Sequence, residues 1–138
     1  MNKKVFVDTN IFIYAYVNND FEKHSIVKKY LQNENNIFVI SAQILSEIYA
    51  TLAKYRIEHT KIMPVIAEIS NLCEVYSIGL QTVKFALDLK NRYGFSYWGC
   101  LFLASALENG CQLVFTEDLQ DGQIIDGRLK ILNPFNST

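Results

Sequence analysis

The sequence has few of the residues on which several common kinds of site are built. Its three cysteines, Cys73, Cys100 and Cys111, form no Cys-x-x-Cys pair, which argues against a zinc site or a disulfide framework. Its two histidines, His24 and His59, lie in polar stretches away from any strand end, so a histidine general base has little support. No glycine-rich phosphate loop is present, which argues against nucleotide binding.

A strong charge imbalance and long apolar runs are also missing. The net charge is −1 over 138 residues, so the chain is not a broadly basic nucleic-acid coat, and any nucleic-acid binding needs a local patch. No apolar run reaches the length of a membrane span, and the N-terminus lacks the apolar segment of a signal peptide. We therefore expect a cytoplasmic protein that does not enter a membrane.

The composition is that of a globular domain. Half of the residues are apolar, and the chain is long enough to bury a sizeable core. No internal repeat, low-complexity tract or linker interrupts it. We therefore expect a single domain over residues 1–134 and a short C-terminal tail at residues 135–138.

Short apolar runs alternate with helical stretches along the chain. The apolar runs predict strands at residues 4–7, 37–40, 74–76, 113–115 and 129–131. The periodicity between them predicts helices at residues 11–16, 21–32, 41–56, 60–71, 80–91 and 97–108. This alternation indicates a parallel sheet covered by helices on both faces, in which ligands bind beyond the carboxyl ends of the strands.

An acidic residue is associated with the end of three of these apolar runs. Asp8 directly follows the first run, Asp118 follows the run at 113–115, and Glu47 lies about two turns into the helix after the second run. A carboxylate at a buried strand end costs free energy unless a partner compensates it, and three at one edge suggest a shared cation. Oxygen ligands alone favour Mg²⁺ or Mn²⁺, and a metal-bound water attacks a phosphodiester without help from a histidine.

Each acid taken alone also has an ordinary structural role open to it. Asp8 could cap the helix that follows Thr9, although Asn10 could equally fill that cap. Glu47 could be a boundary glutamate that reaches water, and Asp118 could be an unremarkable acid of a turn. The case for a site therefore rests on the three acids sharing one end of the predicted sheet.

Four segments of the chain carry a more specific pattern. They are Val7-Asp8-Thr9-Asn10, Ser46-Glu47, Phe95-Ser96-Tyr97-Trp98, and Thr116-Glu117-Asp118-Leu119-Gln120-Asp121-Gly122. In order and spacing these segments resemble the motifs of the PIN-domain family, and within it the VapC-like toxins of type II toxin–antitoxin systems. The resemblance covers nearly the whole chain.

The resemblance implies a fold, an activity and partners. The fold would be a three-layer α/β/α sandwich with a central parallel sheet of four to five strands. The activity would be that of an endoribonuclease that depends on Mg²⁺ or Mn²⁺ and acts on RNA, in a protein that is typically a homodimer. A cognate antitoxin protein would block the site.

The resemblance also assigns roles to residues by their position in the motifs. Asp8, Glu47 and Asp118 would hold the metal. Thr9 and Thr116 would orient carboxylates or waters through their hydroxyls, Asn10 would help at the entrance, and Asp121 would lie in an outer position. Turn and capping chemistry is the alternative role for Thr9, Asn10 and Thr116.

One position departs from the family's pattern. The family has an acid, usually Asp, directly after the aromatic segment, and this chain has Gly99. If Ser96 is the helix N-cap, position 99 is the third residue of the helix, where an acid would serve both the metal and the helix N-terminus. Glycine serves neither and costs up to about 1 kcal/mol in helix propensity. We therefore expect the chain to fold but to bind metal poorly and to cleave RNA slowly or not at all.

Three origins of Gly99 agree with the sequence, and one of them implies a second function for the protein. One base change converts an Asp codon into a Gly codon, so loss of activity could be selected when a toxin is made without its antitoxin. Deliberate inactivation would produce the same glycine, and so would natural degeneration of a family member. A degenerate member would be a module that binds RNA or an antitoxin without cutting.

Overall fold

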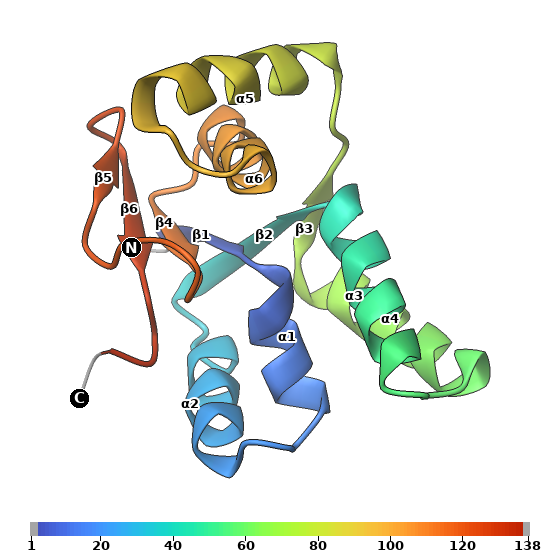
Figure 1. Cartoon of the computed structure of the whole chain (residues 1–138). Coiled ribbons are helices and arrows are strands. Elements are labelled where there is room, and N and C mark those ends of the chain that lie inside the picture. The colour runs from blue at the N-terminus through green and yellow to red at the C-terminus, as the bar shows by residue number, and fades with distance from the viewer. Residues whose placement is uncertain (1–2, 137–138) are drawn as a thin grey trace.

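A mixed sheet forms the centre of the computed structural model, which describes residues 3–136 (Figure 1). Within these residues the sheet has six strands in the order β3-β2-β1-β4-β6-β5. They are β1 (Lys3–Val7), β2 (Asn36–Ser41), β3 (Glu74–Tyr76), β4 (Leu113–Phe115), β5 (Ile124–Ile125) and β6 (Leu129–Leu132). All neighbouring pairs are parallel except β5 and β6, which are antiparallel.

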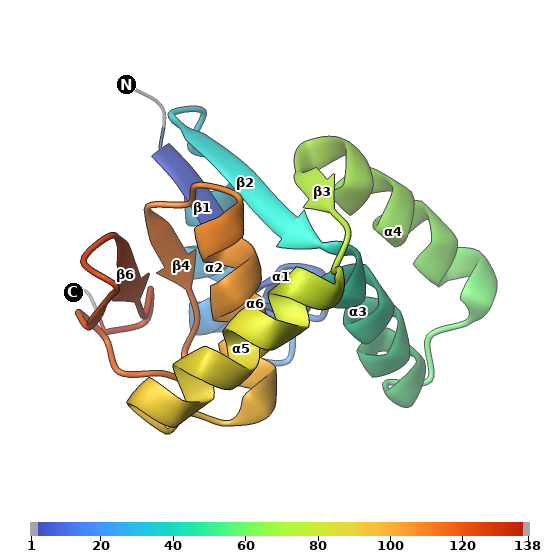
Figure 2. The same ribbon diagram turned by 90° about the horizontal axis from the view of Figure 1, so that it is seen from above.

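Helices flank the sheet on both faces. In the described part of the chain they are α1 (Thr9–Tyr16), α2 (Phe21–Leu31), α3 (Ala42–Lys54), α4 (His59–Leu72), α5 (Leu80–Tyr93) and α6 (Tyr97–Glu108). α5 and α6 lie on one face, α1 and α2 lie on the other, and α3 and α4 extend from the side of β2 and β3 (Figures 1 and 2). None of these helices has the length and apolarity needed to span a membrane. The predicted α/β fold with a central parallel sheet is confirmed.

One strand of the sheet was not predicted. All five predicted strands are present. β5 adds a sixth, which exceeds the expected number of four to five strands. β5 turns back onto β6 through Asp126 and Gly127, whose φ angles are 51° and 67°. Asp-Gly is a signal for a tight turn, but here Arg128 follows it, and β5 is only two residues long and shows no alternating pattern.

The predicted tail lies only partly within the described residues. Positions 137–138 lie outside them. Phe135, which falls within the predicted tail, packs edge-on against Tyr14 of α1, with ring centroids 5.3 Å apart.

Aromatic residues pack the sheet against the helices on both faces. Phe6 of β1 stacks on Phe102 of α6, with ring centroids 6.1 Å apart. On the opposite face, Phe115 of β4 meets Tyr30 of α2 edge-on at 5.1 Å. Because both faces are covered, the sheet leaves only its edges for a ligand, and the carboxyl ends of β1, β2 and β4 share one of them.

The burial of α6 predicts a large difference between two leucine variants. Leu103 of α6 is fully buried, whereas Leu87 of α5 is 50% exposed. Leu103→Ala should lower the free energy of unfolding by about 2–5 kcal/mol, because it leaves a cavity in the core. Leu87→Ala should cost less than about 1 kcal/mol. Urea unfolding followed by far-UV circular dichroism measures both, and equal losses would show that α6 is not a core helix.

Candidate functional site

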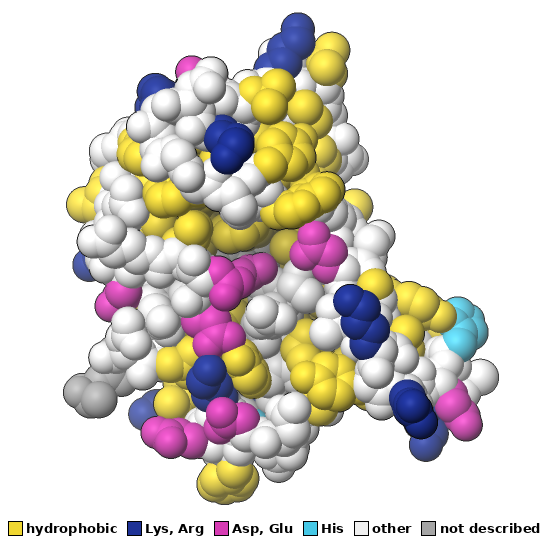
Figure 3. Space-filling model, viewed as in Figure 1, with side chains coloured by type: hydrophobic (Ala, Val, Ile, Leu, Met, Phe, Trp, Pro, Cys, Tyr) yellow, Lys and Arg dark blue, Asp and Glu magenta, His cyan; other side chains and the backbone are white. Residues whose placement is uncertain are grey.

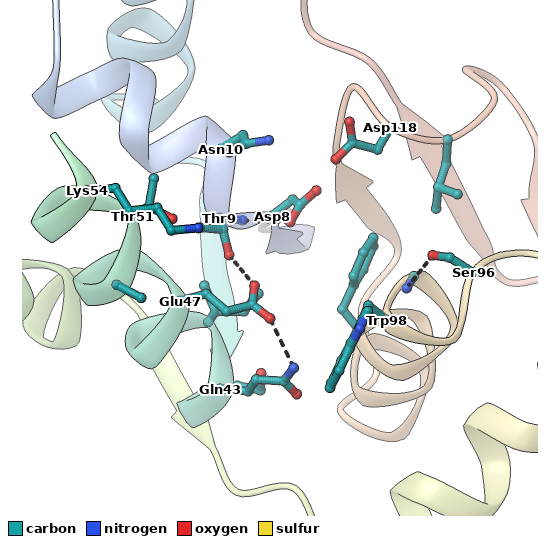
Figure 4. Close-up of a pocket in the computed structure, with 16 residues that line it drawn as sticks. Asp8, Thr9, Asn10, Gln43, Glu47, Thr51, Lys54, Ser96, Trp98 and Asp118 are labelled. Atoms are coloured by element: carbon teal, nitrogen blue, oxygen red, sulfur yellow. Dashed lines mark hydrogen bonds between the residues drawn. The ribbon is translucent and has the colours of Figure 1, made fainter.

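Three parallel strands bring the predicted acids to one cavity of about 390 Å³. Asp8 directly follows β1, and its backbone N–H donates to the carbonyl of Phe115 in β4 at 3.0 Å. Asp118 follows β4, and Glu47 reaches the cavity from α3. Their side chains turn toward the same space in Figure 4, and acidic side chains gather along the hollow that crosses the middle of the face in Figure 3.

The wall formed by α3 explains how Glu47 reaches the cavity. One face of this helix carries Ile44, Ile48 and Leu52 into the core. Positions four, eight and eleven residues after Gln43 return to the cavity side of a helix with 3.6 residues per turn. The polar residues of α3 that line the cavity are accordingly Gln43, Glu47, Thr51 and Lys54.

Both carboxylate oxygens of Asp8 accept a hydrogen bond. The backbone N–H of Thr9 donates to Oδ1 at 2.7 Å, and the Thr116 hydroxyl donates to Oδ2 at 2.9 Å. The Thr116 oxygen in turn accepts from the backbone N–H of Asp118 at 3.1 Å. Asp8, rather than Asn10, is the N-cap of α1. The same carboxylate therefore caps a helix and faces the cavity, so the two roles of Asp8 do not exclude each other.

Glu47 is oriented by two donors. The Thr9 hydroxyl donates to its Oε2 at 2.7 Å, and the Gln43 side-chain amide donates to its Oε1 at 3.0 Å. Since Thr9 also donates its backbone N–H to Asp8, one set of linked hydrogen bonds connects Asp118, Asp8 and Glu47. Such a network holds the cavity side chains in defined positions.

The loop that carries Asp118 is anchored on its other side by Glu117. This carboxylate accepts from the Tyr14 hydroxyl at 2.5 Å and from the Lys23 ammonium at 2.8 Å. The Lys23 ammonium also lies 4.9 Å from the centre of the Tyr14 ring. α1 and α2 therefore fix the chain one residue before Asp118.

The environment of Asp8 opposes its ionisation. Its pKa is raised to about 6, mainly by burial and to a smaller extent by the negative charges of Asp118 and Glu47. The hydrogen bonds from Thr116 and Thr9 lower it, but they do not balance the loss of water. Carboxylates that repel one another at the end of a buried strand are a donor set suited to a hard divalent cation.

Gly99 forms part of the cavity wall where α6 begins. Ser96 is the N-cap of α6, and its hydroxyl accepts from the Gly99 N–H at 3.1 Å, so position 99 is the third residue of the helix. In the described residues, no group of three His, Cys, Asp or Glu side chains is placed to hold a metal ion. Asp8, Glu47 and Asp118 are oxygen donors of the kind that a hard cation takes, but as placed in the described residues they do not form a metal site.

A side chain at position 99 would meet little resistance. A Cβ there would lie 3.2 Å from the Ser96 hydroxyl oxygen and 3.8 Å from a methyl group of Leu119. The first contact is tight, but a serine hydroxyl moves by a few tenths of an ångström at small cost. The position therefore has room for a larger residue that faces the cavity.

The remaining predicted residues divide into two groups. Asn10 lines the cavity and is exposed, and Thr116 is buried behind Asp8. Asp121 is not among the residues that line the cavity: it is exposed, and its carboxylate accepts from the backbone N–H of Asn133 at 2.8 Å. The turn after Asp118 directs Asp121 toward the segment that follows β6.

Sequence reasoning did not assign Gln43, Lys54 or Trp98 to the cavity wall. Gln43 lies four residues before Glu47 and Lys54 lies seven after it, so both share a helix face with Glu47. Helical spacing could therefore have identified Gln43 and Lys54. No comparable signal marks Trp98, because an aromatic residue in an apolar helix ordinarily belongs to the core.

Comparisons with known proteins identify a family for most of the chain. Residues 5–120 match the PIN domain family. A search of curated proteins finds no match.

Several solved structures are similar in fold. VapC20 of Mycobacterium tuberculosis, described as a Sarcin-Ricin loop cleaving toxin, aligns with a TM-score of 0.67 and 21% identity over 83% of this chain and 91% of that chain. A toxin–antitoxin complex from Klebsiella pneumoniae aligns with a TM-score of 0.69 and 19% identity over 94% and 97%. VapBC2 from Rickettsia felis, bound to a DNA fragment from its promoter, gives 0.67 and 14% over 94% and 99%. At these identities the similarity establishes the shared fold.

The raised pKa of Asp8 predicts how stability depends on pH. The folded-state pKa of about 6 lies above the ordinary value of 3.8, so between these values the folded chain holds a proton that the unfolded chain releases. The contribution of Asp8 to stability is therefore present below about pH 4 and is lost as the pH rises toward 6. Asp8→Asn should remove this loss and be more stable than the parent at pH 7, by up to about 3 kcal/mol.

Urea unfolding of both proteins at several pH values, with EDTA present, measures the effect. The difference in unfolding free energy between variant and parent should grow from about pH 4 to 6 and then level off. A constant difference over that range would mean that Asp8 ionises normally in the fold.

Proposed function

Because this chain belongs to the PIN-domain family, we propose that it is a divalent-metal-dependent endoribonuclease by descent and the toxin of a VapC-like toxin–antitoxin pair. The observation that carries the proposal is the convergence of Asp8, Glu47 and Asp118 on one cavity from three distant parts of the sequence. Two threonine hydroxyls hold two of these carboxylates in place, which is the arrangement that a site for a cation requires.

In this proposal Asp8, Glu47 and Asp118 hold Mg²⁺ or Mn²⁺. When bound, the cation would supply a Lewis acid and a water of lowered pKa for cleavage of a phosphodiester. The Thr9 and Thr116 hydroxyls keep the carboxylates of Glu47 and Asp8 turned toward the cavity. Asn10 is exposed at the entrance, where its amide is able to hydrogen-bond to substrate.

Gly99 is the reason to propose that metal binding and RNA cleavage are impaired in this chain. It contributes no side-chain oxygen to a wall that faces the three acids, and α6 has no acidic residue in its first turn. An aspartate there would add a ligand and would also interact favourably with the N-terminus of α6.

We further propose an antitoxin protein as partner and the cytoplasm as the place of action. The similar structures from Klebsiella pneumoniae and Rickettsia felis are toxin–antitoxin assemblies, which supports a protein partner for this fold. A homodimer remains an expectation from the family. Exposed apolar side chains on α3 and α4, such as Tyr49, Met63 and Leu72, offer surface for either contact.

The second candidate function is that of a binding module, which binds RNA or an antitoxin but does not cleave RNA. The same observations at Gly99 favour it, because a wall without its acid preserves the shape of the cavity but weakens the affinity for a cation. The two candidates differ in whether a divalent cation causes a loss of RNA that EDTA prevents.

Gly99→Asp is the variant that tests the proposed function. It should raise the affinity for Mn²⁺ by about tenfold or more, a change that corresponds to about 1.4 kcal/mol. It should also restore divalent-dependent cleavage of a labelled RNA. Isothermal titration with Mn²⁺ and a gel assay with and without EDTA measure the two effects independently.

Two control variants separate the carboxylate from the side-chain volume. Gly99→Asn has nearly the same shape without the charge, and Gly99→Ala tests the contact of a Cβ with Ser96 alone. If the Asn variant gains as much as the Asp variant, charge at position 99 is not the missing element. If the glycine form already cleaves RNA as fast as the Asp variant, position 99 is not a working ligand. If no variant cleaves RNA, the binding module is the better assignment.

A further inference from the structure

Trp98 exposes its ring at the rim of the acidic cavity. Its side chain is 62% exposed, although tryptophan is a residue that folding ordinarily buries for most of its surface. It lines the cavity together with Asp8, Glu47 and Asp118. An exposed aromatic surface beside a polar cavity is the kind of feature that marks a binding site.

The backbone holds this ring at a defined place. Trp98 is the second residue of α6, between the capping residue Ser96 and the buried Gly99 and Cys100. Tyr97 contacts the indole at an angle of 67°, with ring centroids 5.3 Å apart. Figure 4 shows the indole across the cavity from Gln43 and Glu47 of α3. The ring therefore forms one wall of the cavity.

Lys54 contributes the opposite charge to the cavity. It is the one basic side chain among the described residues that line this space, and it is exposed. It lies on α3, with Thr51 and Thr9 nearby, on the side away from Trp98 (Figure 4). In the described part of the chain it takes part in no ion pair, so its charge is available to a ligand.

An aromatic face and an ammonium on two walls of one cavity match the two parts of a nucleotide. Bases stack on aromatic rings with little regard to sequence, and phosphates bind lysine. A base within a duplex is already stacked on both sides and cannot offer its face to a ring. The chemistry of the two walls therefore favours an unpaired strand over a duplex.

We propose that Trp98 stacks on an unpaired base of an RNA strand while Lys54 contacts its backbone phosphate. This inference rests on the proposed action on RNA, and it adds a preference for single-stranded segments over duplexes. Trp98 and Lys54 act on binding and specificity, whereas the three acids act on the reaction.

The fluorescence of Trp98 tests the stacking directly, because it is the only tryptophan in the chain. The protein with Gly99 is titrated in Mg²⁺ with a single-stranded oligoadenosine of about ten nucleotides, and with the same strand annealed to its complement. Emission should fall with the single strand and change little with the duplex. Fluorescence anisotropy of labelled RNA measures binding independently, and a gel verifies that the RNA stays intact. Binding without any change in emission would overturn the proposal.

Variants distinguish the two contacts. Trp98→Ala should weaken binding of the single strand by about tenfold or more, while Trp98→Phe keeps most of the affinity. Lys54→Gln should weaken binding and make the dependence of log affinity on log salt shallower by about 0.7, because one phosphate contact is lost. Trp98→Ala should leave that slope unchanged.

Matched surface controls should have no effect. Phe21→Ala removes an aromatic side chain that is 75% exposed on α2, outside the cavity. Lys84→Gln removes an exposed lysine of α5 that does not line it. If these variants weaken binding as much as the cavity variants do, RNA binding is a general surface effect and the proposal is wrong.

The Gly99→Asp background separates this proposal from the proposed function. If that variant cleaves RNA but the additional Trp98→Ala change leaves KM and the preference for single strands unaltered, the stacking is wrong and the nuclease stands. If it never cleaves RNA although the Trp98 variants bind single strands weakly, the nuclease is wrong and the stacking stands. If an apolar peptide quenches Trp98 and RNA does not, Trp98 is an anchor for a protein and the proposal is overturned.

Discussion

The burial of the Asp8 carboxylate at the end of β1 is the constraint on which the rest of the site depends. A charge in that position is tolerated only with partners, and the chain supplies them from the next residue and from the end of β4. The pairing of β1 with β4 is therefore a structural requirement and also the step that brings Asp118 beside Asp8. Thr9 extends the same arrangement to Glu47, so linked hydrogen bonds join the sheet, the start of α1 and the cavity.

Gly99 shows that the fold and the site depend on position 99 in different ways. The cap of α6 uses the Ser96 hydroxyl and the backbone N–H of residue 99, which every amino acid except proline supplies. Phe102 and Leu103 bury the helix whatever stands at its third position. An acid at this position is therefore dispensable for the structure, which explains how a chain with glycine there keeps the architecture of its family.

The sequence predicts this architecture well where burial is continuous and poorly where a feature depends on the assembled fold. The apolar runs at Val5–Val7 and Leu113–Phe115 indicate central strands, because a strand covered on both faces has no polar alternation. The strand at 124–125 is too short to show a pattern, and the exposure of Trp98 follows from the placement of α6 rather than from its own neighbours. The acids could be named from the sequence. Which carboxylate the Thr9 and Thr116 hydroxyls each contact is known only from the folded structure.

Because β1 pairs with β4, the cavity is able to form only late in the synthesis of the chain. Asp8 and Asp118 are 110 positions apart in the sequence, so the ribosome adds Asp118 long after Asp8. By the time β4 is made, β2, β3 and the six described helices have already been synthesised, but β1 has lacked its neighbour on one side throughout. A nascent chain at that point thus contains most of the described helices and strands but not all three carboxylates. Synthesis must pass Asp118 before the carboxylates meet, so a product truncated earlier lacks the site.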